Sequence, residues 1–388
     1  MTSATAAADA AVPASLVRFG IASRPMARFS NEQTVSVLNG PTSFAPIPLP
    51  ATGMVRKVSL YFTFTGTCAS AGAVVAGDGP WNLLSGITLT DATGQPIFQP
   101  ISGFNLYLWN KFMPTGIENF KGRYMPFNDP HVGPEFAYSA TATTFTAKFR
   151  LDLEFEIDSQ TGYGCIPNLD ANASLQLRVD AAAYTNAFAG TTPSAAALSV
   201  RVEQHYWAPV PGTLNGLSVQ SLPPGYGDFV EVRYENQNAT ALAENTNPIT
   251  ARGGLIKGVI AVSRAAGVRT DFAANSNVGL VFDNTAIFEG IRLESWQDQV
   301  RRQYGYIGAD VTTSYAPLTA GTLPGLDRGV LVWNFDALAE GRESWLATRV
   351  GTLLQAKFTP GAGATQIEFI TGLCQVRDSA TFYGPDPA

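Results

Sequence analysis

The chain has 388 residues, and only 14% of them are charged (25 Lys and Arg, 31 Asp and Glu), against about 25% in an ordinary soluble protein. No apolar run approaches the ~18 residues of a membrane helix, and an aromatic content of 11% can bury a core, which excludes a helical membrane protein and a disordered chain. The net charge of -6 disfavours bulk electrostatic wrapping of nucleic acid. A large folded chain with so few charges is expected to contact other protein over much of its surface.

Residues 1–40 are predicted to form an N-terminal arm. The first stretch lacks the basic region of a secretion signal. Arg18, Arg24 and Arg28 are opposed only by Asp9 among the first 30 residues, so this segment has a net charge of +2 in an otherwise acidic chain. The arm is either a solvated, flexible segment or one that contacts an anionic surface or a neighbouring subunit.

Strand patterns dominate the rest of the chain. From Ala147 to Asp158 every odd position is apolar and every even position is charged, which is typical of a strand with one face in a core. Other alternating or apolar runs, each predicted to be a strand, lie at 58–65, 175–180, 200–203, 230–234, 255–262, 330–335, 354–358 and 367–370. Short strands separated by Gly- and Pro-rich turns predict an all-β sandwich or barrel.

Two segments show helical spacing of apolar residues instead. Ser102 can N-cap the first helix and Pro114 closes it, while Gly305 closes the second. Apolar side chains at i, i+4 and i+8 define the packing face of each helix. These residues are Phe104, Leu108 and Phe112 in the first helix, and Trp296, Val300 and Tyr304 in the second.

The order of these elements predicts an internal duplication. Lys57 lies in the first core strand of one half, and Lys257 holds the same place in the other half, at an offset of 200. The helices then match Phe104 with Trp296 at an offset of 192. Sequence identity between the halves is weak, so the repeated order of strand, turn and helix carries this interpretation.

A Pro-rich stretch separates the two halves. Proline stiffens the chain and blocks strand continuation, so residues 208–225 are predicted to be a linker. The first half is then residues 41–207, and the second is residues 226–388, including a C-terminal tail. Each half suits an eight-stranded jelly roll with one short helix. The predicted fold is therefore all-β, with two tandem jelly rolls preceded by the arm.

Candidate chemistry is sparse. The cysteines (Cys68, Cys165 and Cys374) are far apart, which argues against a disulfide framework or a zinc site and predicts small buried thiols. His131 and His205 have no spaced partner for a metal. No nucleophile elbow, phosphate-binding loop or dinucleotide fingerprint is present. We therefore expect no catalytic site, no cofactor and no metal.

Two kinds of functional site could be built from residues that this chain contains. Paired carboxylates of a glycosidase could come from Asp152, Glu154, Glu156 and Asp158. These acids alternate with large apolar residues along one strand, so a solvated strand face is the favoured interpretation. A sugar-binding groove could be lined by tryptophan, but most tryptophans lie among apolar residues and are expected in the core or at subunit contacts. The six are Trp81, Trp109, Trp207, Trp296, Trp333 and Trp345.

Three segments of the first half resemble a known family. They are the entry strand Ile47–Val58, the turn Gly79–Leu84 with the sequence GPWNLL, and the helix start Ser102–Leu108 with the sequence SGFNLYL. They look like the first roll of the double jelly-roll major capsid proteins of tectivirus-like phages, which are tailless and icosahedral. The resemblance covers the first half, and the second half is supported by the order of its elements and its length.

The resemblance implies a structural function. Three chains would form a homotrimeric, pseudo-hexameric capsomer, and capsomers would tile an icosahedral virion shell beside penton and minor capsid proteins. The arm with Arg18, Arg24 and Arg28 would lie near the inner face, where an internal membrane can be present. No sequence-specific nucleic-acid binding is expected. The protein would be made in the host cytoplasm and located in the virion.

Two other functions stay open from the sequence alone. A carbohydrate-binding jelly-roll protein of a phage spike or adhesin would lose glycan binding when an exposed tryptophan is replaced, and it would form no shell. A β-sandwich hydrolase with paired acids would lose activity on one Asp or Glu replacement.

Overall fold

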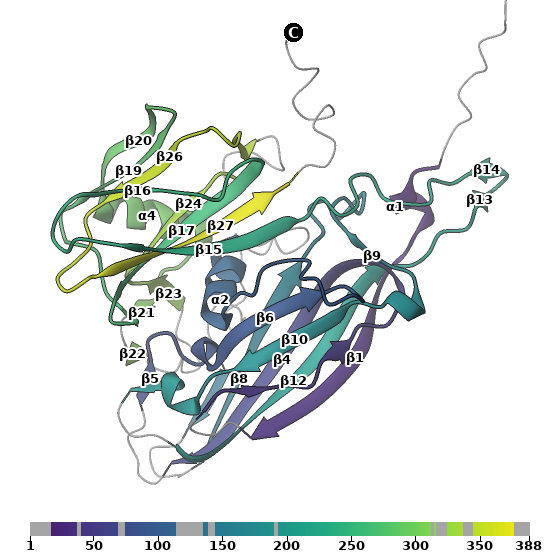
Figure 1. Cartoon of the computed structure of the whole chain (residues 1–388), viewed down its shortest axis with the longest axis horizontal. Helices are drawn as coiled ribbons and strands as arrows, with labels where there is room; N and C mark the ends of the chain where they lie inside the picture. Colours follow the sequence, from purple (N-terminus) through teal and green to yellow (C-terminus); the bar gives the residue numbers. More distant parts are fainter. Residues whose placement is uncertain are drawn as a thin grey trace, which may run out of the picture.

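The computed structural model describes residues 17–36, 40–68, 74–113, 135–138, 144–189, 193–311, 314–315, 324–336 and 344–375. Most of the predicted arm (1–16), Pro114, His131 and the C-terminal tail (376–388) lie outside the described residues. Figure 1 shows two β-sheet lobes, with helix α2 (Gly103–Phe112) between them. None of the helices in the described part of the chain has the length and apolar character needed to cross a membrane.

The first lobe is a sandwich of two antiparallel sheets. Its large sheet has the order β1-β12-β4-β8-β7, with β9 also paired to β4, and its small sheet places β10 between β6 on one side and β2 and β3 on the other. The segment 95–101 extends the small sheet through bridges to β6. The strands are β1 (Pro25–Ser36), β2 (Thr42–Ser43), β3 (Ile47–Pro48), β4 (Gly53–Cys68), β6 (Leu84–Thr90), β7 (Glu135–Tyr138), β8 (Thr144–Glu154), β9 (Ile166–Asn168), β10 (Gln176–Ala181) and β12 (Pro193–Trp207).

Aromatic side chains fill the space between these sheets. Phe62 of β4 stacks on Phe149 of β8 at 5.0 Å between ring centroids, and Trp81 stacks on Tyr107 of α2 at 3.6 Å. The alternation predicted for residues 147–158 places Ala147, Phe149, Leu151 and Leu153 in this core. Period-2 patterning thus sets which face of each strand is buried.

The second lobe repeats this topology. Its large sheet has the order β15-β27-β17, with β24 on the far side of β17, and its small sheet has the order β16-β26-β19-β20. The strands are β15 (Val230–Asn238), β16 (Asn245–Pro248), β17 (Leu255–Ala265), β18 (Val268–Arg269), β19 (Asn277–Phe282), β20 (Thr285–Arg292), β24 (Val330–Asn334), β25 (Leu346–Ala347), β26 (Leu354–Phe358) and β27 (Gln366–Cys374). β4 and β17 hold the same central place, so the predicted duplication into two jelly rolls is confirmed.

Each roll has its helix at the same stage of the chain. Helix α2 precedes β8, and helix α4 (Leu293–Tyr304) precedes β24. The Oγ of Ser102 accepts a hydrogen bond from the amide of Asn105 at 3.2 Å, and Gly305 caps α4 with a left-handed φ of 71°. The side chains predicted to form the two packing faces are all buried: Phe104, Leu108, Phe112, Trp296, Val300 and Tyr304.

Shorter elements decorate the two rolls. One small sheet joins them through backbone pairing, because β5 of the first roll pairs with both β11 and β22, and β22 comes from the second roll. The remaining elements are α1 (Phe19–Ala22), β5 (Val74–Ala76), η1 (Trp81–Leu83), η2 (Ala171–Ala173), η3 (Tyr184–Ala187), β11 (Phe188–Ala189), β13 (Thr213–Leu214), β14 (Leu217–Ser218), β21 (Ala309–Val311), β22 (Ser314–Tyr315) and β23 (Pro324–Asp327).

The predicted boundary of the N-terminal arm is wrong. Residues 25–36 are not an arm but strand β1, which pairs with β12 along the edge of the large sheet. Most residues of this edge strand are exposed, on both of its faces. Apolar and polar residues therefore do not alternate along it, and the sequence pattern did not predict a strand here. Arg18, Arg24 and Arg28 are all exposed, and Arg28 lies within β1.

The Pro-rich linker is tied to the segment before β1. The amide of Val17 donates to the carbonyl of Ser218 at 2.9 Å, and Ser23 donates through its Oγ to the carbonyl of Ala208 at 2.5 Å. Strands β13 and β14 form a hairpin within the linker. In Figure 1 this hairpin and α1 lie together at one end of the molecule.

Candidate functional site: the contact between the two rolls

Helix α2 is buried on every side, including its polar residues. On the first-roll side, the side-chain amide of Asn110 donates to the backbone carbonyl of Asp152 at 2.9 Å and accepts from the amide of Asp152 at 2.9 Å. The opposite side of α2 meets the large sheet of the second roll (Figure 1). A helix from one roll therefore forms the core of the contact between the two.

Two glycines make a flat platform for α2 on that sheet. Gly258 of β17 and Gly372 of β27 are cross-strand neighbours. A Cβ on Gly372 would lie 2.0 Å from the Trp109 ring, and a Cβ on Gly258 would lie 2.4 Å from the Met113 methyl group. Glycine inside a strand permits close approach, so Trp109 and Met113 rest directly on the backbone.

The second roll also caps the C-terminus of α2. The last carbonyl groups of a helix have no partner within the helix and carry partial negative charge. Here the carbonyls of residues 111–113 accept hydrogen bonds from Tyr306 at 2.9 Å, Tyr304 at 2.6 Å and Lys257 at 3.1 Å, respectively. All three donors belong to the second roll, so α2 is completed only when the rolls are in contact.

A buried ion pair crosses the same contact. The ammonium of Lys111 lies 2.7 Å from Asp327, which also accepts a hydrogen bond from the Tyr107 hydroxyl at 3.0 Å. Both members of the pair are at most 1% exposed. Burial lowers the pKa of Lys111, and Asp327 opposes that effect. Because a buried charge without its partner is costly, this pair is expected to hold the rolls in one arrangement.

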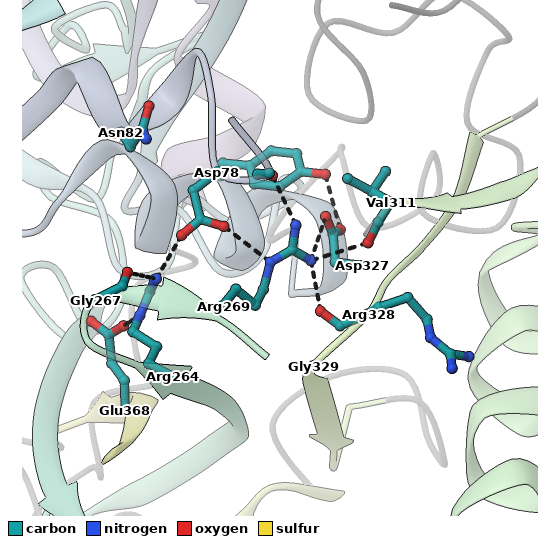
Figure 2. Close-up of polar contacts among 12 residues, drawn as sticks. Asp78, Asn82, Arg264, Gly267, Arg269, Val311, Asp327, Arg328, Gly329 and Glu368 are labelled. Carbon is teal, nitrogen blue, oxygen red and sulfur yellow. Dashed lines mark hydrogen bonds and ion pairs between the residues drawn. The ribbon is translucent and has the colours of Figure 1, made fainter. Parts of the chain in front are cut away.

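A chain of charges extends from this pair along the contact (Figure 2). Asp78 of the first roll accepts from Arg264 at 2.6 Å and from Arg269 at 3.0 Å. Arg264 continues to Glu368 at 2.9 Å. Both guanidinium groups lie over the Phe104 ring of α2, at 5.3 and 5.5 Å from its centroid. Charged groups at this contact are thus paired and shielded rather than exposed.

The ammonium of Lys257 gives the contact a pH dependence. Burial lowers the pKa of Lys257 to about 8, although Asp336 and Glu154 oppose this. The unfolded side chain titrates near 10.4. Between these two pKa values the unfolded chain binds more protons than the folded chain, so the free energy of unfolding rises with pH.

The variant Lys257→Met is expected to lose this pH dependence, which in the wild type raises the free energy of unfolding by at most about 1.4 kcal/mol per pH unit. The measurement is urea unfolding of both proteins at pH 8 and pH 9.5, and parallel pH profiles would contradict it.

The prediction of a solvated carboxylate face is wrong for two residues. Asp152 is 1% exposed and pairs with Lys57 and Arg150, and Glu156 is 5% exposed and accepts from Arg56 and from the Trp207 indole, each at 2.6 Å. Burial raises the pKa of Glu156, while Arg56 opposes that. Each buried acid is paired with a cation, which does not match two free carboxylates across a cleft.

The other candidate groups are buried or partly buried. Cys165 and Cys374 are buried free thiols, and the side chain of Cys68 lies outside the described residues. Burial lowers the pKa of His205 to about 4. No cluster of three metal-ligating residues occurs in the described ranges. All six tryptophans are buried, none more than 7% exposed, so they offer no stacking surface for a sugar.

Sequence reasoning missed most of the contact between the rolls. Gly258, Gly372, Arg269 and Asp327 were not singled out, because each gains its role from a residue over 50 positions away. One usable signal was present: a glycine inside an apolar strand run often marks a close approach of another segment. Gly258 and Gly372 both have that context.

Solved structures share this architecture. The crystal structure of the STIV MCP aligns with a TM-score of 0.57 at 10% sequence identity, covering 93% of this chain and 100% of that chain. A chain in the atomic structure of Sulfolobus Turreted Icosahedral Virus aligns with a TM-score of 0.56 at 13% identity, covering 92% and 93%. The major capsid protein P2 of bacteriophage PM2 aligns with a TM-score of 0.47 at 11% identity, covering 90% and 96%.

The first two of these alignments span both rolls, so the chain has the double jelly-roll fold that the sequence predicted. No protein-family model matches the chain, and no curated protein matches its sequence.

Proposed function

We propose that this protein is a major capsid protein, with a structural rather than a catalytic role. The observation that carries the proposal is the contact between the rolls, in which α2 is capped by the second roll and the Lys111–Asp327 pair is buried. Such a contact fixes the two lobes as one rigid building block. The double jelly-roll fold, shared with a virus capsid protein over both rolls, supports the same conclusion.

We further propose that three chains form one capsomer. The two rolls have the same topology, and the helix side of one packs on the large sheet of the other, which is a head-to-tail contact. Head-to-tail contacts form closed rings when the rotation permits. Three chains would place six similar rolls around one axis, which is a pseudo-hexamer able to tile an icosahedral shell.

The other proposed partners are an anionic surface near the N-terminal segment and the further proteins of the shell. Arg18, Arg24 and Arg28 are exposed, and the first two flank α1 beside the β13–β14 hairpin. Their charge suits an anionic surface such as an internal membrane, or a neighbouring capsomer. Penton and minor capsid proteins would complete the shell, and sequence-specific nucleic-acid binding is not part of the proposal. The protein would be made in the host cytoplasm and assembled into the virion, in keeping with a bacteriophage capsid.

Electron microscopy and mass measurement of the purified protein test this proposal. We expect particles with the mass of three 41.2-kDa chains and hexagonal outline, and closed shells or hexagonal sheets at high concentration. Replacing the exposed side chains of Arg18, Arg24 and Arg28 by glutamine should leave the trimer intact but weaken attachment to anionic vesicles or to neighbouring capsomers. A protein that stays monomeric at every concentration would contradict the capsid function.

A further inference from the structure

A second, smaller core lies apart from the main core of the two rolls. It consists of four buried side chains: Phe19, Met54, Cys165 and Trp207. None of them is more than 4% exposed, and Val210 and Leu222 of the linker pack against them. The small core therefore joins three parts of the chain, which are the segment before β1, the first roll and the linker.

Polar contacts fix the first-roll side of the small core. The Trp207 indole donates a hydrogen bond to Glu156 at 2.6 Å, and the same carboxylate accepts from Arg56 at 2.6 Å. The guanidinium of Arg56 also lies 4.9 Å from the Trp207 ring centroid. Strands β4 and β12 and the segment after β8 supply these side chains. The first roll by itself therefore gives this wall of the small core its shape.

Residues 17–24 form a strap across the opposite side of the small core. The Phe19 ring meets the Trp207 ring edge to face, with 6.1 Å between centroids. Within the strap only Phe19 and Ser23 are buried, and helix α1 is a single turn without a side-chain N-cap. A helix of this length is not stable by itself. One aromatic ring and a few hydrogen bonds to the linker therefore keep the strap in place.

The strap holds the linker at two points. The amide of Val17 donates to the carbonyl of Ser218, and its carbonyl accepts from the amide of Gln220, each at 2.9 Å. At the other end of the strap, the amide of Ala208 donates to the carbonyl of Arg24 at 3.0 Å. The β13–β14 hairpin lies between these two points in the chain, and Figure 1 shows it beside α1. The placement of the hairpin therefore depends on the strap.

We propose that the strap opens and closes as one unit, and that its closed state holds the linker and the β13–β14 hairpin against the first roll. Opening releases one buried ring and a few hydrogen bonds, which is a small part of the native contacts, so it occurs without unfolding of either roll. It frees residues 208–222 and uncovers the thiol of Cys165. Because the strap and the linker belong to one chain, this switch operates in a monomer as well as in the proposed capsomer.

Hydrogen exchange of the full-length protein, followed by mass spectrometry, tests the coupling between strap and linker. Phe19→Ala removes the buried ring, and Gly20→Ala places a Cβ 2.1 Å from the carbonyl oxygen of Gln160, which forces the strap away. Because the burial of one aromatic side chain shifts an equilibrium by at least about tenfold, we expect both variants to speed exchange in residues 17–24 and 208–222 by that factor. Exchange in β4 and β12 should stay unchanged.

Ile21→Ala is the matched control, because Ile21 lies on the same turn and is 72% exposed. Its exchange should equal that of the wild type in every segment. Faster exchange of the strap alone in the Phe19 and Gly20 variants would show that the linker does not depend on the strap. Faster exchange throughout both rolls would show that the strap is part of one cooperative unit with them. Either result, or no change in any segment, would overturn the inference.

Alkylation of cysteine reports opening of the strap in the wild-type chain. Cys165 and Cys374 are both 0% exposed, but Cys374 belongs to the main core. Since opening of the strap uncovers only Cys165, iodoacetamide is expected to label Cys165 at least about tenfold faster than Cys374 in the absence of denaturant. Gly20→Ala should accelerate labelling at Cys165 alone. Labelling of Cys165 that is no faster than that of Cys374 would mean that both thiols are reached only by unfolding, and would overturn the inference.

Discussion

The variant Gly372→Val is expected to lower the free energy of unfolding by about 2–3 kcal/mol and to loosen the second roll from the first. A Cβ at this position would lie 2.0 Å from the Trp109 ring, with two further ring atoms at 2.5 and 2.9 Å. Trp109 is itself buried, with 3% of its surface exposed, so its ring cannot turn out into solvent without leaving the core. Urea denaturation measures the loss, and faster cleavage within the linker at 208–225 under limited proteolysis would report the separation of the rolls.

Gly351 provides the matched control. It is an exposed glycine of the second roll with ordinary φ, and no atom lies within 4 Å of its would-be Cβ, so Gly351→Val should change stability by less than about 0.5 kcal/mol. A smaller side chain opposite the new valine should relieve part of the steric clash. The double variant Gly372→Val with Trp109→Leu is therefore expected to lose less stability than the sum of the losses of the two single variants. Equal stabilities of the Gly372 and Gly351 variants would show that the platform carries no packing role.

The variant Asp327→Asn is expected to be destabilising by about 3–5 kcal/mol, the loss typical of a buried ion pair that loses one partner. Asn keeps the shape of the side chain but leaves the ammonium of Lys111, at 0% exposed, without its counter-ion. Arg269 loses its weaker contact with Asp327 at 3.5 Å as well. Urea denaturation at neutral pH measures this loss, and the trimer fraction should fall with it because the two rolls no longer hold one arrangement.

A double variant separates the ion pair from its surroundings. Replacing Lys111 by Met in the Asp327→Asn background removes the orphaned charge and should recover at least half of the loss, since apolar replacement of a buried pair is often neutral. The control is Asp298→Asn, which breaks the exposed Arg302–Asp298 pair on α4 and should cost no more than about 0.5 kcal/mol. Additive losses in the Lys111 and Asp327 variants would refute the pairing.

The local rules of the sequence predicted much of this fold. Alternation at 147–158 identified β8 and its inward face, because a strand with one buried face repeats every two residues. Ser102 and Gly305 marked one end of each helix, because capping depends on residues within one turn. The repeated order of elements then predicted two jelly rolls, and resemblance in the first roll pointed to a capsid protein.

Other features of the structure were not predicted from the sequence, because they depend on residues far apart in the chain. Strand β1 has exposed residues on both faces, and only its hydrogen bonds to β12, over 160 positions away, make it a strand. Asp152 and Glu156 have the spacing of a solvated face, but both are buried, and they contact Lys57, Arg56 and Trp207, which lie more than 50 positions away in the chain. The sequence of helix α2 predicted one apolar packing face, but in the structure the second roll also covers residues outside that face.

The sequence by itself determined the two rolls, the ends of their helices and the low surface charge. Each of these follows from residue type and short-range spacing, which fix backbone preference and the buried side of each element. Only the tertiary structure decided that Gly258 and Gly372 lie under α2 and that Asp327 neutralises Lys111. The physical reason is that packing and charge pairing depend on which surfaces meet, and residues far apart in the chain decide that.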